Sequence, residues 1–232
     1  MTDATKNMNN LKVKAYGGLL SVLIAMAVLI FLPAWTLNYR QAWAFLVVFG
    51  ASGLVIIAYF MKKDPEPLER RSSGGPAAEE RTSQKIIMSI VSIAFVALLV
   101  VPALDHRFGW SSMPPYAAIA GDVLVALGWM AIFFVFQENT FTSATIEVAA
   151  DQKVISTGPY AIVRHPMYTG SFLYILGIPI ALGSWWGLLV IVLMLPAILW
   201  RIFDEEKLLG SNLPGYTEYR SRVKHRLVPR VW

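Results

Sequence analysis

The sequence contains no cysteine, and only 15% of its 232 residues are charged. Without cysteine, the chain has no disulfide framework, no thiolate metal site and no thiol nucleophile. Its three histidines, His106, His165 and His225, lie far apart, so we expect no histidine-rich metal cluster. Soluble domains carry about 25% charged residues. So little charge could not cover the surface of a soluble domain of this size.

Hydrophobic residues make up 56% of the chain and gather in six apolar runs. A helix needs about 20 such residues to cross a bilayer. We therefore predict an all-α, polytopic integral membrane protein with five to six transmembrane helices. Its last two runs should form a C-terminal helical hairpin, 168–203, that either crosses twice or dips partway. The first run is too long for a signal peptide and is expected to be retained. The runs are 15–37, 42–61, 86–104, 116–137, 168–183 and 185–203.

The basic residues predict which membrane face each connection occupies. If all six runs cross, 18 of the 20 lysines and arginines fall on the side of the N-terminus. The opposite side holds only Arg40 and Arg107. By the positive-inside rule, both termini should lie in the cytoplasm. The net charge of +5 thus reports topology, and no nucleic-acid partner is expected.

Two parts are predicted from this pattern: four spans in 1–137 and a core in 138–232 that ends in a cytosolic tail. Segment 62–85 is polar and proline-containing, and we predict a flexible, solvated loop. Its Asp64-Pro65 and Arg70-Arg71 pairs could instead cover a site. The apolar runs are almost free of ionisable groups, Asp122 being the main exception, and show no internal repeat, which argues against ion-coupled transport.

Polar motifs concentrate in the core. Gly158-Pro159-Tyr160 and Arg164-His165-Pro166 precede an apolar helix, and Pro166 suits its first turn. The backbone N–H groups at this helix start, with Arg164 beside them, could hold an anionic group. The alternative is an interfacial turn with a snorkelling arginine.

The end of the last apolar run carries Arg201 and Asp204-Glu205-Glu206. Acids there oppose the helix dipole, which suggests a ligand with positive charge or hydroxyls. A simple pair of Arg201 with Glu205, one turn apart in a solvated helix end, is the alternative. In the tail, Tyr216 and Tyr219 can face the same way, and five basic residues of 220–230 could bind anionic headgroups.

These motifs together resemble a known family. Arg164-His165-Pro166-Met167-Tyr168-Thr169-Gly170, followed by an apolar hairpin and Glu205-Glu206, resembles the signature of isoprenylcysteine carboxyl methyltransferases. Gly158-Pro159-Tyr160 and Gly215-Tyr216 fit the same pattern. The resemblance covers about 139–232, and the short chain is similar to the compact prokaryotic members.

The resemblance implies a membrane methyltransferase that uses S-adenosylmethionine and releases S-adenosylhomocysteine. In that family the loop, the hairpin and the tail enclose the cofactor at the cytosolic side. Arg201 then corresponds to the substrate-side residue, and His165 is the candidate base for a thiol or amine acceptor. No metal is implied. The implied cofactor contacts are Lys153, Val154, Ile155, Tyr160, Arg164, His165, Pro166, Met167, Tyr168, Glu205, Glu206 and Tyr216.

The implied acceptor is a lipophilic small molecule or a lipidated chain, and membrane lipids are expected as further partners. A carboxylate like that of isoprenylcysteine is favoured, while a small thiol or a lipid amine, as in phospholipid N-methylation, stays open. A related alternative is an NADPH-dependent reductase of the sterol-reductase type, which favours asparagine where Met167 stands. A non-catalytic scaffold or carrier is the third possibility. The sequence leaves the oligomeric state open.

Overall fold

The structure, a computed structural model, describes residues 3–70, 75–141, 144–146 and 152–232. Throughout these residues the regular secondary structure is helical, which confirms the all-α prediction. Five of the helices are long and apolar enough to cross a membrane, and α6 is a shorter apolar helix. The helices are α1 (Asp3–Ala34), α2 (Arg40–Lys63), α3 (Glu66–Arg70), η1 (Pro76–Ala78), α4 (Thr82–Phe108), α5 (Pro115–Glu138), η2 (Gly158–Ala161), α6 (Pro166–Ala181), α7 (Trp186–Asn212) and α8 (Tyr216–Arg222).

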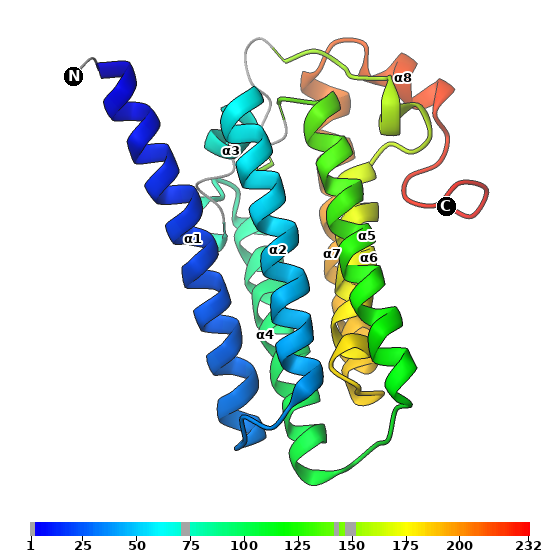
Figure 1. The fold of residues 1–232 in the computed structure, drawn as a ribbon. Coiled ribbons are helices and arrows are strands. Elements are labelled where there is room, and N and C mark those ends of the chain that lie inside the picture. Colours follow the sequence, from blue (N-terminus) through cyan, green and yellow to red (C-terminus); the bar gives the residue numbers. More distant parts are fainter. Residues whose placement is uncertain (1–2, 71–74, 142–143, 147–151) are drawn as a thin grey trace.

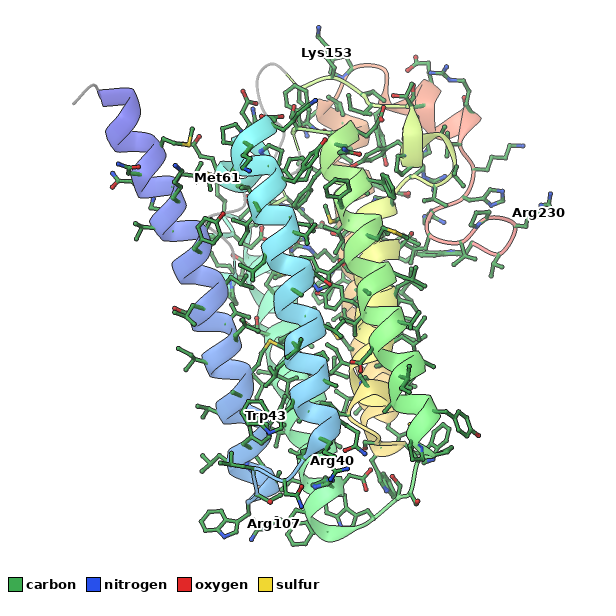
Figure 2. All side chains as sticks on the ribbon, in the orientation of Figure 1. Arg40, Trp43, Met61, Arg107, Lys153 and Arg230 are labelled. Carbon is green, nitrogen blue, oxygen red and sulfur yellow. The ribbon has the colours of Figure 1, made fainter. Side chains whose placement is uncertain are left out.

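The long helices run up and down in one bundle, and both ends of the chain lie at the same end of it (Figure 1). Lys153 and Arg230 mark this end in Figure 2, which we call the site end. Arg40 and Arg107 lie at the opposite end, the turn end. The two basic residues that the sequence assigns to the other side of the membrane are therefore far from the termini.

Helices α5 and α6 pack backbone to backbone through glycines. A Cβ atom on Gly121 would lie 2.1 Å from the backbone nitrogen of Ala181, and one on Gly128 would lie 2.6 Å from that of Tyr174. Gly177 of α6 faces the carbonyl oxygen of Gly121 in the same way, at 2.7 Å from its Cβ position. Small residues allow such close approach between membrane helices. This contact fixes α6, and with it the loop that precedes α6, against α5.

At the turn end, a buried carboxylate holds the tip of the α6–α7 hairpin. Asp105 at the end of α4 is 2% exposed and accepts hydrogen bonds from the Ser111 N–H at 2.7 Å and the Ser111 hydroxyl at 2.5 Å. The hydroxyl of Ser184, in the hairpin turn, donates to the same carboxylate at 2.5 Å. The hairpin therefore runs to the same end of the bundle as the α4–α5 connection.

Segment 62–85 differs from the solvated loop that the sequence predicts. It contains the short helices α3 and η1, and the N–H of Glu66 at the start of α3 donates to the Asp64 carboxylate at 3.2 Å. Near its end, Glu79 is 3% exposed and Gln84 is fully buried. The prediction is wrong for these residues because they contact α7, as described below; Arg71 lies outside the described residues.

Candidate active site

Two adjoining cavities open near the site end. The polar cavity, of about 120 Å³, lies between the loop before α6, the end of α7 and α8. The apolar cavity, of about 540 Å³, extends from it between α4, α6 and α7. Four residues line both cavities: Thr145, Ile146, Tyr160 and Glu205.

The structure brings most of the predicted site residues to these cavities. The polar cavity is lined by eight of the predicted cofactor residues: Lys153, Val154, Ile155, Tyr160, Arg164, His165, Glu205 and Tyr216. Met167, Tyr168 and Arg201 line the apolar cavity. Pro166 begins α6 as predicted but faces a groove on the other side, and Glu206 lines neither cavity.

Glu206 is the centre of a buried ion cluster. Its side chain is 5% exposed, and Oε1 lies 2.8 Å from Nη2 of Arg164. The same oxygen is 3.2 Å from Nε2 of His165, while Oε2 accepts from Nε of Arg226 at 3.1 Å. A buried carboxylate with such partners is stabilised as an anion. Glu206 thus joins α7, the signature loop and the tail, rather than facing a ligand.

The tail occupies the anion site that the sequence suggests at the start of α6. Nη1 of Arg164 donates to the carbonyl oxygens of Val223 at 2.9 Å and Lys224 at 2.8 Å. The backbone N–H groups of Arg164 and His165 donate to the carbonyls of His225, at 2.9 Å, and Arg226, at 3.0 Å. The anion-site hypothesis is therefore wrong for these donors, because the chain's own carbonyls satisfy them.

Arg201 and Glu205 are linked through a tyrosine and not directly. Nε of Arg201 donates to the Tyr168 hydroxyl at 3.1 Å, and that hydroxyl donates to Oε2 of Glu205 at 2.7 Å. The ion-pair partner of Arg201 is instead Glu79, whose Oε1 lies 2.8 Å from Nη1. With Arg201 8% exposed, the solvated Arg–Glu pair considered for this helix end is also wrong.

Sequence reasoning missed the contribution of segment 79–84. Gln84 accepts from Nη1 of Arg201 at 2.7 Å and donates to Asp204, and Arg81 pairs with Asp204 at 2.7 Å. One signal was available, because Gln84 is a polar residue in the first turn of an apolar helix. Nothing in the spacing, however, links it to residues more than a hundred positions away.

Two tyrosines of α8 form one wall of the polar cavity, with ring centroids 5.8 Å apart. Tyr219 donates its hydroxyl to the carbonyl of Tyr160 at 2.8 Å, and burial raises its pKa to about 12. The Tyr216 hydroxyl is buried without a hydrogen-bond partner among the described residues. Burial, followed by the charges of Glu206 and Glu205, raises the pKa of Tyr216. Its hydroxyl therefore stays protonated and can donate to a ligand.

The loop before α6 is set by contacts with the end of α5. Thr157 donates its hydroxyl to Glu138, and Asn139 donates to the Tyr160 hydroxyl at 2.9 Å. Gly158 has φ +54°, and a Cβ atom there would lie 2.6 Å from Oε2 of Glu138. Glycine adopts this left-handed backbone without strain and leaves room for the Glu138 side chain. Tyr160 is thereby held between the two cavities.

Comparison with known proteins finds one family model and two curated relatives that match parts of the chain. Residues 116–212 match the family model of phospholipid methyltransferases. The Protein-S-isoprenylcysteine O-methyltransferase of Schizosaccharomyces pombe is 33% identical over 79 residues, which are 32% of this chain and 32% of that protein. The nickel-cobalt-cadmium resistance protein NccN of Alcaligenes xylosoxydans xylosoxydans is 28% identical over 141 residues, 58% of this chain and 59% of that one.

The matched regions span about a third and about three fifths of these two curated relatives. They confirm the resemblance that the signature residues predict, since the family match contains Arg164–Gly170 as well as Glu205 and Glu206. These matches show a similarity to the phospholipid and isoprenylcysteine methyltransferases, and the long apolar helices indicate a multi-pass membrane protein.

Proposed function

We propose that this protein transfers a methyl group from S-adenosylmethionine to a lipophilic acceptor at the cytosolic face of the membrane. The observation that carries the proposal is the meeting of a polar and an apolar cavity at Tyr160 and Glu205. A polar cofactor and an acceptor with an apolar chain can thus approach the same point from two sides.

The residues of the polar cavity fit such a cofactor. The partnerless hydroxyl of Tyr216 can donate to an oxygen or nitrogen of the ligand. Glu205 keeps one oxygen that is 4.0 Å from Nδ1 of His165 and can accept from an ammonium or a ribose hydroxyl. Tyr160 offers a ring face for adenine or for a sulfonium. Bound S-adenosylmethionine would supply an electrophilic methyl group on a positively charged sulfur.

The chain's own residues contribute mainly by positioning the reacting atoms and by excluding water. Methyl transfer gains most from alignment of the reacting atoms and exclusion of water. The apolar cavity supplies both through side chains such as Phe95, Ile175 and Met194. His165 is 4% exposed, contacts Glu206 and does not line the apolar cavity, so we assign it to positioning Glu206 and not to proton removal.

The sidedness is part of the proposal and can be tested directly, because the natural chain has no cysteine. Ser112→Cys at the turn end and Thr217→Cys in α8 replace exposed residues. An impermeant maleimide should label the first from outside intact cells and the second only after permeabilisation. The reverse pattern would place the site on the outer face and contradict the proposal.

The decisive experiment is calorimetric binding of S-adenosylhomocysteine and of NADPH to the detergent-purified protein. We expect binding of S-adenosylhomocysteine alone, weakened in Glu205→Ala. Binding of NADPH alone would favour the sterol-reductase alternative. If a folded sample binds neither, a non-catalytic role becomes the better explanation.

A further inference from the structure

The surroundings of Arg201 restrict what this residue can bind. Its guanidinium group lines the apolar cavity, yet most of its N–H donors are already used by the protein. Nε donates to Tyr168 at 3.1 Å, Nη1 to Gln84 at 2.7 Å and Nη2 to the carbonyl of Ala144 at 3.2 Å. The planar fork that recognises a carboxylate through two parallel hydrogen bonds is therefore not free.

The charge of Arg201 is also compensated from within. Oε1 of Glu79 lies 2.8 Å from Nη1, and the two side chains are 2% and 9% exposed. Opposite charges at this distance and degree of burial compensate each other, and removal of one leaves the other buried and uncompensated. Arg201 and Glu79 thus form an electrically neutral pair at the wall of the cavity.

Glu79 is fixed by contacts on both of its sides. Its Oε2 accepts from the Ile146 N–H at 3.3 Å. Two residues further on, Arg81 pairs with Asp204 at 2.7 Å, and Gln84 contacts both Arg201 and Asp204. These bonds attach the start of α4 to α7 beside the Arg201–Glu79 pair, so they hold Glu79 next to Arg201 as its counter-ion.

Among the described residues, Arg201 and Glu205 are the charged side chains that line the apolar cavity. With Arg201 neutralised, a negatively charged head group there would face the carboxylates of Glu205 and Glu79 without a free cation. Like charges repel strongly where water is scarce. An uncharged or basic head group meets no such penalty.

We infer that Glu79 is a specificity-determining residue: as the counter-ion of Arg201, it excludes anionic head groups from the apolar cavity and selects an acceptor whose reacting end is uncharged or basic. This inference rests on the proposed function and names the acceptor class, which includes amines and thiols. An amine would react as its free base: the nitrogen lone pair forms the new N–C bond as the S–CH3 bond of the cofactor breaks, and the methylated product releases its proton to water. A thiol would likewise lose its proton to water. It argues against the carboxylate acceptor that the resemblance favours.

The test compares three amphiphiles with the same chain, hexadecanol, hexadecylamine and hexadecanoate, by native mass spectrometry of the detergent-purified protein. We expect the wild type to bind the alcohol and the amine at least about tenfold more tightly than the acid, the selectivity that a difference of about 1.4 kcal/mol gives. All three should lose binding in Ser92→Trp, which places an indole at the mouth of the cavity. Preference of the wild type for hexadecanoate would overturn the inference.

Variants then assign the selectivity to Glu79. Glu79→Gln leaves Arg201 uncompensated, and binding of hexadecanoate should rise about tenfold or more. Glu80→Gln, the exposed neighbour, is the matched control and should change nothing. The double variant Glu79→Gln/Arg201→Gln removes both charges and should not show the increased binding of hexadecanoate. A folded Glu79→Gln protein with unchanged selectivity would contradict the role; if it does not fold, the wild-type preference decides.

These amphiphile measurements need no cofactor. The same samples are tested for S-adenosylhomocysteine binding by calorimetry. Loss of cofactor binding with retained amphiphile selectivity would refute the proposed function and leave the role of Glu79 in head-group selection intact. Cofactor binding together with preference for hexadecanoate would support the proposed function and refute the role of Glu79 in head-group selection.

Discussion

The two ends of the bundle bury polar groups in different ways. At the turn end, the Asp105 carboxylate receives its hydrogen bonds from Ser111 and Ser184, and its contacts hold a turn in place. At the site end, Glu206 and Arg201 take part in clusters of several charges that join three or four segments. One hydroxyl there, that of Tyr216, has no partner in the described chain. The Asp105 cluster at the turn end is satisfied from within the protein, whereas Tyr216 at the site end keeps bonding capacity for a ligand.

The largest effect should come from Glu206→Gln. This change leaves Arg164 buried beside His165 and Arg226 without its counter-ion, and loss of one member of a buried pair costs about 3–5 kcal/mol. We expect a strongly lowered melting temperature in detergent and no detectable S-adenosylhomocysteine binding. Glu218→Gln, at an exposed position of α8, is the control and should behave as wild type. An unchanged melting temperature for Glu206→Gln would show that the cluster is not structural.

Asp105→Ala tests the turn end. It removes the acceptor of three donors, and each buried donor left unsatisfied costs about 1–3 kcal/mol. The melting temperature should fall, while the affinity of the remaining folded protein for S-adenosylhomocysteine should match wild type. Ser112→Ala, next to the cluster but exposed, is the matched control. If Asp105→Ala weakens cofactor binding in the folded fraction, the two ends are coupled, and the role of Asp105 is not confined to stability.

The tyrosine pair of α8 gives a finer comparison within the site end. Tyr216→Phe removes a hydroxyl that the protein does not use, so stability should be unchanged while affinity for S-adenosylhomocysteine falls about tenfold, the loss of one hydrogen bond to a ligand. Tyr219→Phe breaks the bond to the Tyr160 carbonyl and should lower the melting temperature instead. Equal effects of the two substitutions on calorimetric affinity and on melting would remove the evidence for a ligand at Tyr216.

The smallest effect on the cofactor is expected from Ser92→Trp. The residue is exposed on α4 and lines the apolar cavity away from the polar one. Affinity for S-adenosylhomocysteine should stay within about twofold of wild type, less than 0.5 kcal/mol. Transfer of a radioactive methyl group to membrane-extracted acceptors should be lost. A large drop in cofactor affinity would mean that one ligand fills both cavities.

Hydropathy predicted the helical bundle well, because each span must present an apolar surface of the required length to lipid. The first and second runs, 15–37 and 42–61, lie largely within α1 and α2. The signature and the motifs around it likewise identified residues that line the polar cavity, because the positions of Tyr160, His165 and Glu205 follow from local motifs.

The sequence did not predict which polar residues, far apart in the chain, pair with one another. Glu79 and Arg201 are separated by three α-helices, and an acid in a polar segment has the same pattern whether it is solvated or buried. Arg164 had an expected ligand, but its partners are Glu206 and two backbone carbonyls of the tail, and backbone carbonyls carry no sequence signal. The contact of α5 with α6 depends on Gly121 and Gly177, whose meaning appears only when both helices are placed.

The attachment of the tail to the signature loop has a consequence for the timing of maturation. Residues 223–226 provide the carbonyls that satisfy Arg164 and His165, and they are translated long after the loop itself. Helices of a membrane protein can enter the bilayer as they are made, whereas the donors of this loop have only water or transient partners until residues 223–226 have left the ribosome. The complete site can therefore form only after the tail has been synthesised, some sixty residues later than the loop.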